Sequence, residues 1–279
     1  TTITKINNIF WVGTANGLYK TILDGEQLRI IEKMEMTTWD NRLVSDLTIL
    51  SIFEDKEGDI WIGSGDEGIF KYNPDKNSFE NYGFDPKNEN GISSSRINCF
   101  FQDNFNVLWI GTAQGGVNKL DMSQKQFISY SNNPYDTKSI ASNLIMDILE
   151  DKQGKLWISS YDGEVCRSTE PVNDKNIGNL QFKRLKNQIS LPQQEFFSSI
   201  FQDSRGFIWM GSERSIVVYN PILNQFKKVE LENNGQVANV SKCRMIGQVD
   251  SNTILLGGEN IFLIQNPWTV IQNQKNPVL

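Results

Sequence analysis

Histidine is absent from the 279 residues of this chain. Its absence excludes Ser-His-Asp and Cys-His catalysis, histidine general bases and nearly all catalytic zinc sites. Long apolar runs are also missing, since none approaches the roughly 20 residues of a membrane helix. The formal net charge of −6 argues against a surface for nucleic acid or anionic membrane. We therefore expect no catalytic residue, no metal, no cofactor, no nucleic-acid partner and no membrane contact by this domain.

Cysteine is scarce as well. Cys99, Cys166 and Cys243 are odd in number and far apart in the chain. Such residues are usually buried free thiols, which behave as small apolar side chains. We expect three free thiols, and one disulfide is the alternative that the spacing leaves open.

The sequence does contain a repeat of aspartate, turn residue and tryptophan. Its clean copies span Asp55–Trp61, Asp103–Trp109, Asp151–Trp157 and Asp203–Trp209. A shortened first copy ends at Trp11, and the last copy has Leu255 where the tryptophan is expected. The marker positions follow one another at intervals of 46 to 52 residues. A period of this size in a β-rich sequence is typical of a β-propeller.

One unit shows how the repeat would fold. Leu47–Phe53 is apolar nearly throughout, as in a strand buried on both faces. A turn follows, and Ile60–Ser64, Ile69–Tyr72 and Ser78–Tyr82 are the next expected strands. We predict an all-β fold, a β-propeller of four-stranded antiparallel blades with six repeat units visible.

The expected domain organisation is a single propeller over residues 1–272. Its blades are expected at about 1–38, 39–85, 86–133, 134–185, 186–231 and 232–272. Residues 273–279 are expected to be an exit linker towards a following domain. Segments between blades, such as Thr37–Asp46, are polar and are expected to be irregular surface loops.

The repeated tryptophans and aspartates are interpreted as scaffold. An indole at the same point of each unit fits packing between neighbouring sheets. An aspartate at the first turn position can accept hydrogen bonds from the turn's own amides. One residue type in one hairpin of several units cannot be catalytic in all of them. The residues given this structural role are Trp11, Trp61, Trp109, Trp157, Trp209, Asp55, Asp103, Asp151 and Asp203.

Several positions of these units recur in register. The best copy runs from Phe101 through Asp103 and Leu108-Trp109-Ile110-Gly111-Thr112 to Val117, and its lead-in Ile92–Ile97 is echoed by Ile140–Ile145. These units resemble the two-component regulator propeller repeat over about residues 7–230. The fifth unit departs from the pattern because it lacks the glycine pair, and the sixth because it lacks tryptophan. Propellers of this family usually have seven blades, so a seven-bladed ring with part outside this chain is an alternative.

The resemblance implies a function. Such repeats are typical of the periplasmic sensor region of hybrid two-component system sensor histidine kinases, and this chain resembles the C-terminal propeller of that region. The domain itself would be non-catalytic and would sense a glycan-derived oligosaccharide. The expected partners are a second propeller and an immunoglobulin-like domain of the same protein, with a homodimer in the full-length receptor. A distal histidine kinase would then control glycan-utilisation genes.

A binding site is expected on the face opposite the aspartate hairpins, because the loops there differ from unit to unit. Exposed aromatic rings suit the apolar face of a sugar, while amide, carboxylate and guanidinium groups suit its hydroxyls. The candidate ligand-binding residues are Trp39, Arg42, Arg96, Tyr135, Tyr161, Asp162 and Arg214.

Two other functions stay open at this stage. A propeller enzyme acting on glycans, a glycosidase or a lyase, would need a catalytic pair, and Asp66 with Glu67 is the formal candidate. The aspartate box of sialidases is one residue shorter between aspartate and glycine, and lyase propellers of the streptogramin type need a histidine. A protein-interaction scaffold is the third possibility.

Overall fold

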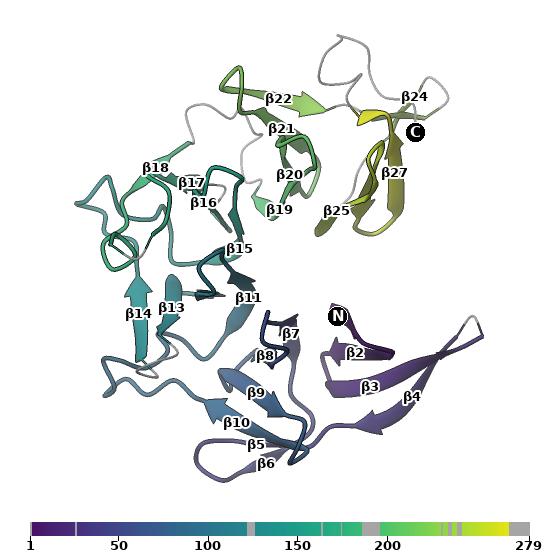
Figure 1. The fold of residues 1–279 in the computed structure, drawn as a ribbon, viewed down its shortest axis with the longest axis vertical. Helices are drawn as coiled ribbons and strands as arrows, with labels where there is room; N and C mark the ends of the chain where they lie inside the picture. The colour runs from purple at the N-terminus through teal and green to yellow at the C-terminus, as the bar shows by residue number, and fades with distance from the viewer. Residues whose placement is uncertain are drawn as a thin grey trace. The chain divides into compact units, whose positions relative to one another are not determined.

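The computed structural model describes residues 2–25, 27–121, 126–162, 164–173, 175–185, 196–229, 231–233, 236–238 and 242–267. The elements assigned in these ranges are β-strands that pair into successive sheets (Figure 1). The predicted all-β class and the β-propeller of six units are confirmed. The described part of the chain contains no helix long and apolar enough to cross a membrane.

The chain divides into two compact units, and the first comprises residues 1–131 with 143–145. It contains three four-stranded sheets, which we number blades 1 to 3. Their strands are β1 (Thr2–Ile6), β2 (Ile9–Thr14), β3 (Gly17–Asp24) and β4 (Gln27–Lys33); β7 (Ile49–Glu54), β8 (Ile60–Ser64), β9 (Ile69–Asn73) and β10 (Ser78–Tyr82); β11 (Ile97–Gln102), β12 (Leu108–Thr112), β13 (Val117–Asp121) and β14 (Gln126–Tyr130). The segment Thr37–Asp46, expected to be irregular, contributes to a short additional pair, β5 (Met36–Thr37) with β6 (Leu43–Val44).

The second unit comprises residues 132–142 and 146–279 and contains blades 4 to 6. Their strands are β15 (Ile145–Glu150), β16 (Leu156–Ser160), β17 (Val165–Ser168) and β18 (Phe182–Arg184); β19 (Phe197–Gln202), β20 (Ile208–Ser212), β21 (Ile216–Asn220) and β22 (Gln225–Val229); β25 (Met245–Asp250), β26 (Thr253–Gly257) and β27 (Ile261–Gln265). β23 (Leu231–Asn233) and β24 (Gln236–Ala238) form a separate pair. Blade 6 therefore has three strands within the described residues, where four were expected. The predicted exit linker lies outside those residues.

The Asp–Trp hairpins (residues 55–61, 103–109, 151–157 and 203–209) form the same bonds in four blades. In the first, Asp55 Oδ1 accepts the amides of Glu57 and Asp59 at 3.1 and 2.8 Å. Asp55 Oδ2 accepts the indole N–H of Trp61 at 2.7 Å, and this bond has the same length in the other three hairpins. The fourth residue of each hairpin has a positive φ. It is glycine in three hairpins and Asn106 in the other, and asparagine tolerates a positive φ better than most residues do.

Two of the hairpins also bond to the blade that follows them. The Lys56 amide donates to the side chain of Gln102 at 2.7 Å, and Lys56 Nζ donates to the carbonyl of Asp103 at 2.7 Å. Lys152 forms the same two bonds to blade 5, with lengths of 2.8 and 3.2 Å. The hairpin is therefore a junction between neighbouring blades as well as a turn.

A cation on the third strand completes the packing of several tryptophans. Lys20 Nζ lies 4.9 Å from the Trp11 ring and 4.6 Å from the Tyr72 ring of the next blade. It also donates to the Tyr72 hydroxyl at 2.9 Å. In the same way, Arg167 of blade 4 lies between Trp157 of its own blade and Tyr219 of blade 5. These cations stabilise the junctions through the negative faces of the aromatic rings.

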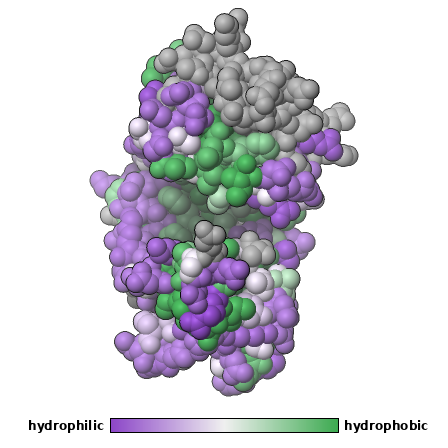
Figure 2. Space-filling model, turned by 90° about the vertical axis from the view of Figure 1, so that its right-hand side faces the viewer, coloured by the Kyte–Doolittle hydropathy of each residue, from purple (hydrophilic) through white to green (hydrophobic). Residues whose placement is uncertain are grey.

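Blades 1 and 6 each have a sheet face whose apolar side chains are exposed. On blade 1 the exposed residues are Ile3, Leu23, Leu28, Ile30 and Ile31; on blade 6 they are Met245, Val249, Ile261 and Leu263. Figure 2 shows hydrophobic surface among hydrophilic residues. The other described blades bury most of their large apolar side chains, including four tryptophans that are fully buried.

The three cysteines are free thiols. Burial raises the pKa of Cys166 to about 12 and that of Cys243 to about 11. Both thiols therefore stay protonated at neutral pH, and a protonated thiol is a poor nucleophile.

Candidate functional site

The loops that lead into blades 2, 3 and 4 contain a related turn, which we call the entry turn (residues 37–43, 85–91 and 133–139). Trp39, Lys87 and Tyr135 are 48 residues apart in the sequence. The first turn closes from Thr38 to Asn41, one residue later than the turns from Asp85 to Asn88 and from Asn133 to Asp136. The amides of Lys87 and Tyr135 donate to the preceding side chains of Asp85 and Asn133 at 2.9 and 3.0 Å. The turn backbone is fixed by these bonds, so it can present different side chains at this position.

Each entry turn is bonded to the outer strand of its own blade. The Trp39 amide donates to Asn81 Oδ1 of β10 at 3.0 Å. The carbonyl of Asn90 accepts the amide of Phe127 at 2.9 Å, and the carbonyl of Lys138 accepts the amide of Phe182 at 2.7 Å. These bonds keep the exposed position of the turn at a fixed place beside the blade.

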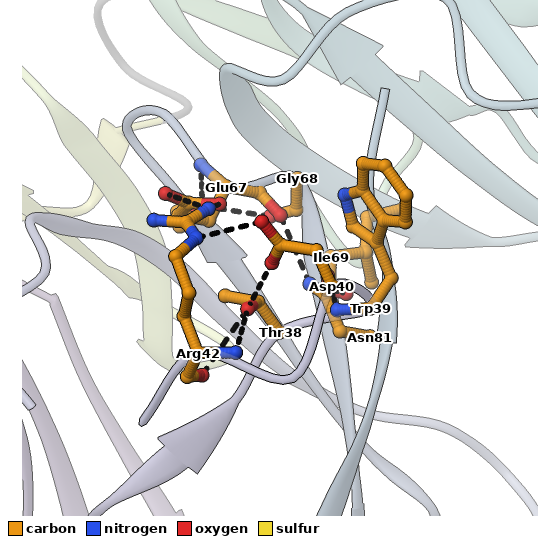
Figure 3. A network of polar contacts seen from close by, with 9 residues as sticks. Thr38, Trp39, Asp40, Arg42, Glu67, Gly68, Ile69 and Asn81 are labelled. Atoms are coloured by element: carbon orange, nitrogen blue, oxygen red, sulfur yellow. Dashed lines mark hydrogen bonds and ion pairs between the residues drawn. The ribbon is translucent and has the colours of Figure 1, made fainter. Parts of the chain in front are cut away.

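The first entry turn forms a network of polar contacts with the turn between β8 and β9 (Figure 3). Arg42 Nε donates to Asp40 Oδ2 at 2.7 Å. Arg42 Nη2 donates to both carboxylate oxygens of Glu67, at 3.0 and 2.8 Å. The Thr38 hydroxyl accepts the Arg42 amide at 3.0 Å. Arg42 therefore joins two loops that are distant in sequence.

Asn81 connects the same two loops from the sheet. Its Nδ2 donates to the carbonyls of Glu67 and Ile69 at 2.9 and 3.0 Å, while its Oδ1 accepts the Trp39 amide. All four of these groups lie in blade 2 or in its entry turn. The side chain of Asn81 therefore uses both its donor and its acceptor to position Trp39 relative to Glu67.

The charges of this network compensate one another. The hydrogen bond from Arg42 lowers the pKa of Asp40 below its ordinary value, and the Thr38 hydroxyl adds to this effect. Hydrogen bonds to Asp40 and Glu67 raise the pKa of the Arg42 guanidinium. The groups are exposed, so salt will weaken their interaction. Arg42 stays charged, but two carboxylates already hold its charge.

Trp39 lies beside this network and its indole is directed away from Arg42 and Glu67 (Figure 3). A Cβ atom placed on Gly83 would be 2.1 Å from Trp39 Cδ1, so the indole packs directly on the backbone of Gly83. The side chain is nevertheless 60% exposed. An aromatic ring supported on one side and open on the other can stack with the apolar face of a ligand.

Arg96 is the other candidate residue of the first unit. It is exposed and follows Ser95, whose carbonyl accepts the amide of Gly68 at 2.8 Å. The Arg96 carbonyl accepts the Ala113 amide at 3.1 Å. Ser95 is therefore bonded to blade 2, whereas the Arg96 carbonyl is bonded within blade 3. The Arg96 guanidinium has no polar partner among the residues that the structure describes.

The remaining candidates belong to the second unit. Tyr135 is 98% exposed at its entry turn. Tyr161 stacks on Phe196 with 4.4 Å between the ring centroids. Asp162 Oδ1 accepts the Ser160 hydroxyl at 2.7 Å, so this carboxylate stabilises its own turn. Arg214 is exposed, and its amide contacts the Ser212 hydroxyl at 3.4 Å.

Within one unit, the structure brings Trp39 and Arg42 together in a single turn. Asn81 and Gly83, which position Trp39, are not among the residues predicted from the sequence. The sequence does contain a pattern that indicates the entry turns, because Trp39, Lys87 and Tyr135 have the same 48-residue spacing as the first three Asp–Trp hairpins.

The chemistry available at this network is binding chemistry. Both oxygens of Glu67 accept hydrogen bonds from Arg42, so Glu67 is not a free proton donor beside Asp66. Within the described ranges, no three carboxylates or thiols are grouped so that they could hold a metal ion. A cleft of about 510 Å³ lies at the opposite end of blade 2, lined by Glu57, Asp59, Lys71 and Glu80 among others; there Lys71 is paired with Asp59.

Four segments of the chain match a known family of propeller repeats. Residues 43–66, 91–114, 139–162 and 190–214 match the model of the two-component regulator propeller. The first three segments run from an entry turn through an Asp–Trp hairpin to the turn after the second strand. The chain therefore carries two-component regulator propeller repeats, as the resemblance predicted.

Two solved structures illustrate the similarity in fold. The extracellular domain assigned to the hybrid two-component system BT3049 of B. thetaiotaomicron aligns with a TM-score of 0.73 at 21% identity. The alignment covers 96% of this chain and 33% of that one. PorZ, a surface component of the type-IX secretion system of Porphyromonas gingivalis, aligns with a TM-score of 0.65 at 14% identity, covering 95% and 40% of the two chains. A comparison with curated proteins finds no match.

Proposed function

We propose that this chain is a non-catalytic ligand-sensing propeller of a hybrid two-component receptor and that it binds a glycan-derived oligosaccharide. The observation that carries this proposal is the pairing of two-component regulator repeats with an exposed, backbone-supported Trp39 in the first entry turn. The repeats support a sensor, and the aromatic ring beside Arg42, Asp40 and Glu67 offers both kinds of contact that a sugar uses.

The wider setting belongs to the same proposal. The domain would be periplasmic and would pack against a second propeller and an immunoglobulin-like domain of the same protein. The full-length receptor would be a homodimer whose distal histidine kinase controls glycan-utilisation genes. A ligand can drive such a receptor only if it binds one arrangement of the domains more tightly than another.

The test is a calorimetric screen of oligosaccharides against this chain, with the mixtures analysed for products afterwards. We expect saturable binding without turnover, and about a tenfold loss of affinity for Trp39→Ala, since stacking on one aromatic ring contributes on the order of 1 kcal/mol. Lys87→Ala is the control, because Lys87 lies 48 residues after Trp39 in the loop that leads into blade 3, and it should bind like the unaltered chain.

Other results would support other functions. Cleavage of a sugar would identify a propeller enzyme, and tight capture of a protein without any sugar binding would identify an interaction scaffold. Binding that needs a preceding propeller joined to this chain would place the ligand at the contact of two domains, and it would contradict a site built on Trp39 alone.

A further inference from the structure

The charges around Trp39 bear on the chemical class of the ligand. Asp40 and Glu67 belong to the network, and Asp66 is an exposed neighbour of Glu67 in the same turn. Arg42 is the cation of the two turns and pairs with Asp40 and Glu67, so the formal charge of the two turns is −2 at neutral pH.

The cation of the site is already engaged. Arg42 donates through Nε and Nη2 to carboxylates, two of these bonds forming the bidentate pair with Glu67. A carboxylate or sulfate on a ligand that approaches Arg42 would also meet the negative charges of Asp40 and Glu67. A hydroxyl group needs only one donor or acceptor, which the edge of the network can supply without losing a bond.

The exposed indole of Trp39 favours a ligand with a flat apolar surface. The indole rests on Gly83, where a Cβ atom would lie 2.1 Å from Cδ1 and 2.2 Å from Nε1. The ring is exposed to solvent, and it lies beside the polar network with its indole directed away from Arg42 and Glu67. The C–H face of a pyranose ring can stack on such an exposed indole.

We infer that the site at Trp39 binds an uncharged sugar ring and rejects uronic-acid or sulfated sugars. The inference rests on the proposed sensing of an oligosaccharide and names the chemical class that this site takes. Arg96, which follows the entry turn of blade 3, is an exposed cation that could attract an acidic sugar. Its contribution to binding therefore has to be measured separately.

The experiment compares neutral galacto- and cello-oligosaccharides with oligogalacturonides and sulfated galactans of similar length, by calorimetry at low and at physiological salt. We expect binding of a neutral probe that falls about tenfold in Trp39→Ala, and binding of acidic probes at least tenfold weaker than that. Asp66→Asn removes one negative charge outside the hydrogen-bonded network. It should strengthen binding of acidic probes by about two- to fivefold at low salt and leave neutral probes unchanged.

The outcomes separate this inference from the proposed function. Preferential binding of an acidic oligosaccharide, lost in Arg96→Ala and kept in Trp39→Ala, would overturn the inference and leave the sensor standing. Cleavage of the probes, or no binding of either class, would overturn the proposed function and the inference with it.

Discussion

The Asp–Trp hairpins and the entry turns recur with the same period, yet only the hairpins recur with the same side chains. Four hairpins contain an indole bond of 2.7 Å from tryptophan to aspartate. In the three entry turns, different side chains recur at 48-residue intervals, namely Trp39, Lys87 and Tyr135. The hairpin side chains make the bonds that hold the blades together, whereas the turn position is free because other groups close the turn.

The difference shows where this fold can change without loss of stability. Asp151 and Trp157 cannot vary independently, because each satisfies a buried group of the other. Tyr135 is 98% exposed and rests on no other side chain for the geometry of its turn. Variation between blades is therefore expected at the entry turns, which is where a binding site can be built on an unchanged scaffold.

The largest effect should come from removing a hairpin tryptophan. We expect Trp157→Ala to lower the free energy of unfolding by about 3–5 kcal/mol, because a fully buried indole leaves a cavity. Urea denaturation followed by circular dichroism measures the change. Trp39→Ala is the comparison from the entry turn, and its unfolding curve should match that of the unaltered chain. Equal losses in the two variants would remove the distinction between the regions.

A carboxylate outside both regions gives a pH dependence. Burial raises the pKa of Asp147 from 3.8 to about 6, against the opposing effect of amide bonds from Ile200 and Ile148. Between pH 4 and 6 the folded state then holds more protons at this site than the unfolded state. The contribution of Asp147 to stability is therefore present below pH 4, falls as the pH rises through about 6, and is constant above.

The difference in unfolding free energy between Asp147→Asn and the unaltered chain isolates this effect, since other carboxylates titrate in both. The unaltered chain should lose up to about 3 kcal/mol relative to the variant between pH 4 and pH 7, from a shift of about two pKa units. Parallel pH profiles would show that Asp147 titrates normally in the folded protein.

A hairpin aspartate should be intolerant of an exchange that an entry turn accepts. Asp151→Asn keeps one acceptor but can direct an amide N–H₂ at the indole N–H, so we expect a loss of about 1–3 kcal/mol. Asp136→Asn is the matched change in an entry turn. Asn88 already fills the equivalent place in blade 3 and accepts an amide bond there, so this variant should unfold with the unaltered midpoint in urea. A large loss in both variants would contradict the comparison.

The smallest effect on stability should come with a clear effect on binding. In Gly83→Ala the new Cβ atom would overlap Trp39 Cδ1, so the exposed indole must move while the core is untouched. We expect an unchanged melting temperature and a loss of affinity for a neutral oligosaccharide that approaches the loss in Trp39→Ala. Calorimetric titration beside a thermal melt measures both quantities. Unaltered affinity would show that the position of the indole on Gly83 does not matter for binding.

Much of the fold could be predicted because its main contacts are local in sequence. Asp55 and Trp61 are six residues apart and recur as a pair, so one pattern reports one hairpin. Lys20, Lys71 and Arg167 follow the tryptophans that they cover at a nearly constant distance in the sequence, and they could have been found in the same way. The β5–β6 pair was missed because each strand has only two residues.

The site was harder to predict because its contacts join residues that are far apart in the chain. Trp39 and Arg42 were named for their chemical types, but nothing in their spacing identifies Glu67 as the partner of Arg42 or Gly83 as the support of Trp39. Arg42 was expected to meet a ligand, and the structure shows a guanidinium that already has two partners. The sequence does not show that the guanidinium of Arg42 already has ion-pair partners.

The packing of the hairpin tryptophans on neighbouring blades predicts that the blades unfold one after another. Trp11 packs against Tyr72 of the following blade, with 5.0 Å between ring centroids, and Trp157 packs against Tyr219 in the same manner. Order in one blade thus depends on order in its neighbour, as in a one-dimensional array with nearest-neighbour coupling. Within each unit, fraying that begins in one blade would spread to its neighbour, and amide hydrogen exchange should then rank the blades of that unit by their distance from the frayed one.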